Sequence, residues 1–193
     1  MLYSFIIYWI FLIMKKIFLC TFFLSVVFSG PSFGKSNSWN DNFDYDSLYY
    51  ASLLLIDENN VLEAIKNLSY IVSDSKNKAL ILNSYYDLGQ IYLSRSSDYS
   101  KSIEYFSIIL NANFSYKVRS GSKLKSFSEL KEKTLFMMSY VYHNHIGNLT
   151  QAQKHYRLFL KKYPESNLIS SVNYELEIIS KLINDFNSQK QHN

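Results

Sequence analysis

The sequence contains a single cysteine, Cys20, among its 193 residues. One thiol cannot form an intramolecular disulfide or a thiolate metal site. The five glycines are scattered along the chain, and none belongs to a glycine-rich phosphate loop. A G-x-S-x-G turn and an H-E-x-x-H helix are also missing. These absences predict a protein that is not an enzyme, and we expect no cofactor, no metal and no small-molecule substrate.

A large excess of charge of one sign is missing as well. Lys15 and Lys16 lie in an apolar N-terminal segment, and without them 18 basic residues stand against 16 acidic ones. A nearly neutral chain lacks the electrostatic footprint that nucleic acid binding needs. We therefore expect no nucleic acid partner.

Three histidines, His143, His145 and His155, are the nearest approach to a metal-binding cluster. His143 and His145 are two positions apart, so they point to different sides of a helix. No aspartate or glutamate lies between Lys133 and Pro164 to complete a site. The pattern favours turn and surface histidines over a metal site.

Long apolar runs occur at the N-terminus alone, over residues 2–13 and 17–28, and neither reaches the ~18–20 residues of a membrane span. From Met14 the chain has the three parts of a secretory signal: two lysines, an apolar stretch, and the small-x-small sequence that ends at Gly34. We expect residues 1–34 to be a signal peptide whose true start is Met14, and the mature protein to be periplasmic. The alternative is an uncleaved segment that anchors the protein in the inner membrane. Residues 35–43 are polar and are predicted to be a flexible tether.

Helical periodicity is clearest over residues 135–164. One face of a first helix is predicted at i, i+3, i+4 and i+7 by Leu135, Met138, Ser139 and Tyr142. After a polar turn, Thr150 is predicted to cap a second helix with the inner residues Ala152, Tyr156 and Phe159. Pro164 then ends this helix, because proline disfavours helical geometry in the residue before it.

The same two-helix pattern occurs twice more. Its upstream copies are Tyr85, Leu88, Gly89 and Tyr92 with Ser102, Phe106 and Ile109, and Leu48, Ala51, Ser52 and Leu55 with Ala64, Leu68 and Ile71. The small positions Ser52, Gly89 and Ser139 are 37 and 50 residues apart. Small residues at these positions allow two helix backbones to approach closely.

This pattern resembles the tetratricopeptide repeat (TPR), a pair of helices of about 34 residues. The resemblance implies an all-α fold, an α-solenoid of about three degenerate helix-turn-helix units over residues 44–186, rather than an ordinary helical bundle. An apolar stripe after Pro164 (Leu168, Val172, Leu176, Ile179 and Ile183) predicts a C-terminal capping helix. Residues 187–193 are predicted to be a disordered tail.

Residues 156–178 also resemble the periplasmic TPR proteins of Gram-negative bacteria that act in outer-membrane assembly or with the Tol system. The matching residues are Phe159, Leu160, Tyr163, Pro164 and Ser166. The resemblance implies a non-catalytic adaptor of the cell envelope that binds partner peptides or helices. The alternative is a TPR subunit of an envelope or secretion complex, anchored in the inner membrane.

The interval of 50 residues implies an insertion at about residues 115–130. Its basic residues, Lys117, Arg119, Lys123 and Lys125, precede the first acid, Glu129. They are candidates for contact with an anionic membrane. A solvated loop is the alternative reading, and it is the one favoured by the composition.

In TPR arrays the first helix of each unit lines a concave groove. Candidate partner-binding residues are therefore those on the first helices that the repeat core does not require: Tyr86, Gln90, Leu93, Met137 and Tyr140. The alternative is that the insertion folds over the groove and buries them within the monomer.

Overall fold

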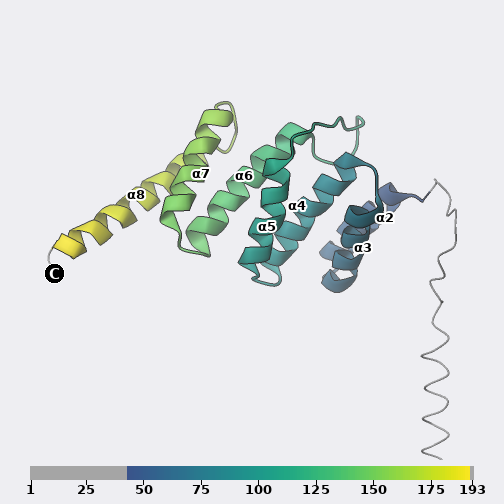
Figure 1. The fold of residues 1–193 in the computed structure, drawn as a ribbon, viewed down its shortest axis with the longest axis horizontal. Helices are drawn as coiled ribbons and strands as arrows, with labels where there is room; N and C mark the ends of the chain where they lie inside the picture. The colour runs from purple at the N-terminus through teal and green to yellow at the C-terminus, as the bar shows by residue number, and fades with distance from the viewer. Residues whose placement is uncertain (1–42, 192–193) are drawn as a thin grey trace, which may run out of the picture. The chain divides into compact units, whose positions relative to one another are not determined.

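The computed structural model describes residues 43–191, and their side chains as far as residue 189 (Figure 1). Within this range the chain forms helices and no strand. The predicted signal peptide, the start at Met14 and all of the tether except Phe43 lie outside the described residues. Within the described range, residues 44–191 form one compact unit.

The helices follow one another with short connections, apart from one longer segment between α5 and α6. They are α2 (Tyr45–Asp57), α3 (Val61–Asp74), α4 (Lys78–Ser94), α5 (Tyr99–Asn111), α6 (Phe127–Asn144), α7 (Leu149–Lys162) and α8 (Ile169–Gln191). Each helix packs against the next one in the chain. Figure 1 shows the resulting row, from α2 at one end to α8 at the other.

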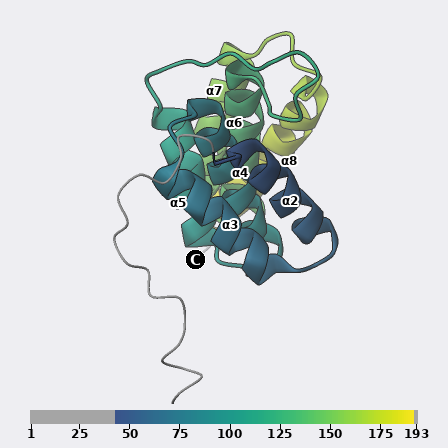
Figure 2. The ribbon, with the colours of Figure 1, turned by 90° about the vertical axis from the view of Figure 1, so that its right-hand side faces the viewer.

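The row has two layers. In the side view of Figure 2, α3 and α5 lie toward one side, and α2 and α8 lie toward the other. The first helices, α2, α4 and α6, also touch their equivalents in the neighbouring units, whereas α3, α5 and α7 make no comparably close contacts with one another within the described range. The all-α solenoid of three helix pairs and a final helix is therefore confirmed.

The predicted small positions lie where the helices are closest. Ser52, Ser139, Ala64, Ser102 and Ala152 all have no exposed surface. The hydroxyls of Ser52 and Ser139 donate to the carbonyl oxygens four residues earlier, Leu48 and Leu135, at 2.7 Å. Each hydroxyl is thus satisfied within its own helix, and the helix pair can close around it.

The turn inside each unit has the same backbone geometry in all three repeats. The residue before the second helix's N-cap has a positive φ: 62° at Asn59, 51° at Ser97 and 71° at Gly147. Glycine adopts this conformation without strain, and asparagine tolerates it better than most residues. The caps that follow are Asn60, Asp98 and Asn148.

The expected cap at Thr150 is wrong by two positions. Asn148 is the N-cap of α7, and its side chain accepts a hydrogen bond from the Gln151 amide at 3.0 Å. Thr150 lies inside the first turn of the helix. An asparagine carbonyl is at least as good a cap as a threonine hydroxyl, so the helix begins at the earlier residue.

Two predicted boundaries also change. Helix α6 begins at Phe127, so the insertion covers residues 112–126, and the last residues assigned to it belong to the helix. The Ser126 hydroxyl caps this helix by accepting from the Glu129 amide at 3.3 Å. At the other end, α8 continues to Gln191, so residues 187–191 are helical rather than part of a disordered tail.

Candidate interaction face

We call the second helices of the units, α3, α5 and α7, the outer layer. The first helices, α2, α4 and α6, present one side to these partners and the opposite side to the exterior of the row. On α4, Gly89 touches α5, because a Cβ added there would lie 2.5 Å from Phe106 Cε1. Positions 83, 87, 90 and 94 lie on the opposite side of α4, at helical spacings of four, three and four. Subtracting the first repeat interval, 37 residues, from these numbers gives the equivalent side of α2. Adding the second interval, 50 residues, gives the equivalent side of α6.

We call this surface the helix-A face. It consists of Asp46, Tyr50, Leu53 and Asp57 on α2, of Asn83, Asp87, Gln90 and Ser94 on α4, and of Lys133, Met137, Tyr140 and Asn144 on α6. Met137, Tyr140 and Gln90 belong to the predicted site, while Tyr86 and Leu93 lie to one side of it, toward α6. On α6, the face offers the thioether of Met137, the phenol of Tyr140 and the amide of Asn144, a combination that suits contact with a polypeptide.

Tyr86 and Leu93 do not lie free at the surface. They are 9% and 8% exposed and belong to the core between α4, α5 and α6. The Tyr86 ring lies 5.9 Å from the ring of Phe106, measured between centroids. Burial, followed by the nearby Asp87 carboxylate, raises the pKa of Tyr86 to about 12. The premise that both side chains are exposed is therefore wrong, and their binding of a partner stays a prediction.

The other predicted residues are more accessible. Gln90 lines a pocket between α2 and α4, and Met137 and Tyr140 are half-buried. The Tyr140 ring meets the His145 ring edge-on at 5.5 Å. These three side chains remain available for partner contact, and Met137 and Tyr140 are the apolar part of the helix-A face on α6.

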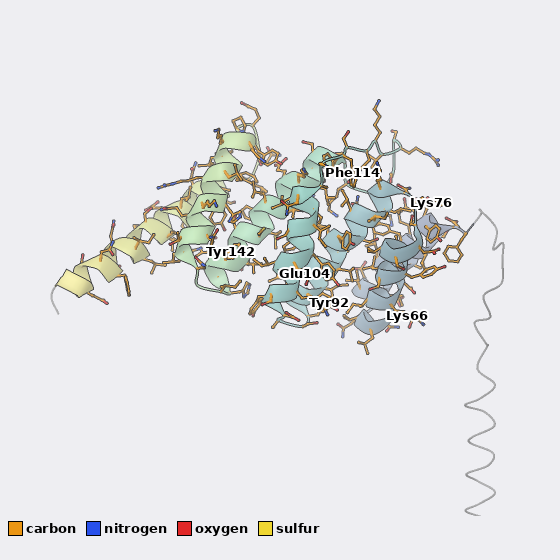
Figure 3. All side chains as sticks on the ribbon, viewed as in Figure 1. Lys66, Lys76, Tyr92, Glu104, Phe114 and Tyr142 are labelled. Carbon is orange, nitrogen blue, oxygen red and sulfur yellow. The ribbon has the colours of Figure 1, made fainter. Side chains whose placement is uncertain are left out.

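The insertion folds onto the upper end of this face. Figure 3 shows Phe114, near the start of the insertion, at the upper edge of the row, whereas Tyr92 lies at its lower edge. Asn83 fixes the insertion by accepting from the Lys125 amide at 2.8 Å and donating to the Lys125 carbonyl oxygen at 3.3 Å. The Tyr116 hydroxyl donates to the same carbonyl at 2.8 Å. The insertion thus covers the helix-A face at Asn83, which is not one of the five predicted binding residues.

The four basic residues of the insertion have different surroundings. Lys117, Arg119 and Lys123 are exposed. Lys125 is half-buried, with its Nζ 4.6 Å from the centroid of the Tyr86 ring, a cation–π contact. Lys125 therefore faces the domain, whereas the other three predicted membrane-contact residues are exposed, with the Nζ of Lys123 5.7 Å from the centroid of the Tyr50 ring.

Below Asn83 lies Asp87, which the sequence reasoning missed. Its carboxylate is 9% exposed and accepts a hydrogen bond from the Tyr49 hydroxyl at 2.6 Å. Burial raises the pKa of Asp87, while Lys125 and the hydrogen bond from Tyr49 act in the opposite direction. Burial and the same carboxylate also raise the pKa of Tyr49. A search limited to apolar and aromatic residues could not find Asp87, but the interval of 50 residues from Met137 identifies it.

The pocket between α2 and α4 has a volume of about 310 Å³. Five of its eight lining residues belong to the helix-A face, and the other three are Ile56, Ile91 and Arg95. The lining residues are Leu53, Ile56, Asp57, Asp87, Gln90, Ile91, Ser94 and Arg95. Its chemistry is an apolar wall with a buried carboxylate, so it can receive a side chain that combines an apolar stem with a polar end.

The prediction of surface histidines is wrong for His143. Its side chain is 8% exposed, and its Nδ1 lies 2.6 Å from Glu175 Oε2 of α8. His145 stacks on Tyr99 at 4.5 Å, and His155 stacks on Tyr142 at 5.3 Å. His143 thus links the third unit to the final helix. In the described part of the chain, no group of three histidine, cysteine, aspartate or glutamate side chains is arranged to hold a metal ion.

Among the helices within residues 43–191, none is both long enough and apolar enough to cross a bilayer.

Residues 133–166, which comprise most of α6 and all of α7, match the family of the tetratricopeptide repeat. No curated protein matches the chain. The match supports a TPR protein, and together with the helix pairs it gives the chain the architecture of a repeat scaffold. TPR repeats typically mediate protein–protein interactions and are non-catalytic.

Proposed function

We propose that this protein is an adaptor of the bacterial cell envelope that binds a segment of a partner protein along the helix-A face. The observation that supports this most strongly is the surface formed by Met137, Tyr140 and the adjoining α2–α4 pocket. Aromatic and methionine side chains are enriched where proteins bind one another. Half-exposed side chains of this kind gather on one side of the first helices, away from the outer layer.

The insertion limits where the partner can bind. Because Asn83 is already bonded to Lys125 and Tyr116, the partner segment runs over the lower part of α4 and across α6. Gln90 and Tyr140 occupy equivalent positions there, one on each helix. A segment that crosses both helices contacts two successive repeats.

Photo-crosslinking in the cell tests this binding site. A photoreactive residue at position 140 should capture a protein, whereas the same residue at Lys154, which is exposed on α7 in the outer layer, should not. Capture of the same protein from both positions would exclude a specific helix-A site. Absence of capture at positions 137, 140 and 90 together would refute the proposed function.

The envelope location rests on the N-terminal sequence, and N-terminal sequencing of the mature protein tests it. A start at Lys35 supports export and cleavage. A start at Met1 or Met14 supports the second candidate, a TPR subunit anchored in the inner membrane by an uncleaved segment. The exposed Lys117, Arg119 and Lys123 would then face the anionic membrane surface.

A further inference from the structure

The Asp87 carboxylate at the α2–α4 pocket is buried without an ion pair. It lies on the pocket lining and is 9% exposed. Its hydrogen bond from Tyr49 satisfies one oxygen. Among the described residues no lysine, arginine or histidine forms a salt bridge with it. A buried carboxylate of this kind is costly unless a cation reaches it.

Lys125 is the cation that acts on Asp87, and it does so from a distance. Its positive charge lowers the pKa of Asp87, yet burial outweighs this effect. The ammonium group is held above the ring of Tyr86 at 4.6 Å. Lys125, a residue of the insertion, therefore reduces the energetic cost of burying the charged Asp87 carboxylate. It leaves open the side of the carboxylate that faces the pocket.

The shape of the pocket suits one long basic side chain. At about 310 Å³ it lies at the low end of the roughly 300–1,000 Å³ range of ligand sites. Leu53, Ile56 and Ile91 offer an apolar wall to the methylene stem, and Asp87 offers its carboxylate to the charged end.

The charges around the pocket favour a cation over an anion. Asp57, exposed on α2, is a second carboxylate on the lining, and Arg95 is the cation that the lining contributes. The lining itself thus carries two carboxylates and one guanidinium, a net negative charge, while the Lys125 ammonium acts on Asp87 from outside the lining. A carboxylate or phosphate ligand would therefore meet repulsion at Asp87.

We propose that the α2–α4 pocket binds a lysine or arginine side chain of the partner segment, with Asp87 as its counter-ion. This inference rests on the proposed function, because it assigns specificity to the helix-A face. The partner is accordingly a protein segment that carries a basic residue at a fixed position. From the pocket, which Gln90 lines, the segment continues toward Tyr140 on α6.

Selection from a random peptide library on the purified full-length chain, kept in mild detergent, tests the inference. Selected peptides should share a lysine or arginine at one position. Replacing that residue by norleucine should weaken binding about tenfold or more, as expected for the loss of a hydrogen bond between charged groups. Norleucine keeps the apolar stem, so the loss measures the charge.

Two variants of the protein assign the effect to Asp87. Asp87→Asn keeps an acceptor for the Tyr49 hydroxyl, and its fold is checked by thermal melting. It should bind the basic and norleucine peptides equally, whereas Asp185→Asn, which removes an exposed charge on α8, should keep the difference. If Asp87→Asn does not fold, Asp57→Asn on the exposed rim serves instead and should weaken the basic peptide a few-fold.

The outcomes separate the inference from the proposed function. Tight binding of peptides without a basic position, or an unchanged preference in Asp87→Asn, would overturn the inference and leave the proposed function standing. Selection of acidic or C-terminal carboxylate motifs would overturn it too. If no peptide is selected and no protein is crosslinked at position 140, the proposed function fails and the inference fails with it.

Discussion

Enlarging Gly89 tests the packing of the repeat most sharply. A Cβ at this position would lie 2.5 Å from Phe106 Cε1 and 2.9 Å from Phe106 Cδ1. Real Cβ atoms do not approach a ring carbon so closely, so either the ring or the helix must move. Phe106 has no exposed surface and lies in the core between α4, α5 and α6, so its ring has little room. The two helices must therefore separate.

The size of the effect follows from two opposing contributions. Replacing glycine by alanine inside a helix ordinarily stabilises it by about 1 kcal/mol. Overpacking of a filled core costs about 1–3 kcal/mol. We therefore expect Gly89→Ala to lower the free energy of unfolding by about 1 kcal/mol, and Gly89→Leu, at the upper end of the overpacking range, to lower it by about 2 kcal/mol.

Urea unfolding followed by circular dichroism measures both changes. Lys154→Leu is the control, because it adds a leucine at an exposed position of α7 and should change little. Phe106→Leu should cost less stability in the Gly89→Ala background than in the wild type, because a smaller side chain relieves the contact. If Gly89→Ala is more stable than the wild type by the full helix-propensity gain, the close approach at Gly89 does not exist.

Three further predictions concern charge. Because burial raises the pKa of Asp87 above 3.8, the native state binds this proton more tightly than the unfolded state. The contribution of Asp87 to stability therefore falls as pH rises from 3.8 through the raised pKa. Asp87→Asn should be more stable than the wild type at neutral pH, and this gain should be lost in acid. Equal melting temperatures for the variant and the wild type at both pH values would contradict this. His143→Ala should lower the free energy of unfolding in urea by about 1–2 kcal/mol, because it leaves Glu175 without its partner. His145→Ala, which removes an exposed ring, should cost less. Equal losses would show that the contact between His143 and Glu175 does not stabilise the fold. If the insertion contacts an anionic membrane, as in the second candidate function, replacing Lys117 and Arg119 together by glutamate should reduce flotation with anionic vesicles and leave flotation with neutral vesicles unaffected. Unchanged flotation would refute membrane contact through the insertion.

The repeat itself was predictable because its determinants are local. Small residues at fixed spacing identified the three helix pairs, since each close approach needs a side chain no larger than serine at positions such as Ser52 and Gly89. The start of α6 was missed because its first turns are mostly polar and have only Phe127 and Leu130 as apolar core residues. The signal was nonetheless present, as Ser126 and Glu129 have the spacing of a capping box.

The candidate site was only partly predictable. Met137 and Tyr140 are partly accessible and remain predicted binding residues, whereas Tyr86 and Leu93 are buried in the core between α4, α5 and α6. Consistent use of the 50-residue interval would have replaced them by Asp87, next to Gln90. The pair of His143 and Glu175 could not be predicted, because it joins residues 32 positions apart across two helices whose contact no local pattern encodes.

We propose that the helix-A face binds a protein. The affinity of Tyr140→Ala for the protein captured by crosslinking is the strictest test of this binding. We expect a dissociation constant at least about tenfold higher than that of the wild type, with helicity and melting nearly unchanged, because aromatic side chains that a partner can cover commonly dominate protein interfaces. Leu158→Ala, at a partly exposed position of α7 in the outer layer, should bind as the wild type does. Unchanged binding by Tyr140→Ala, or an equal loss in Leu158→Ala, would contradict the account.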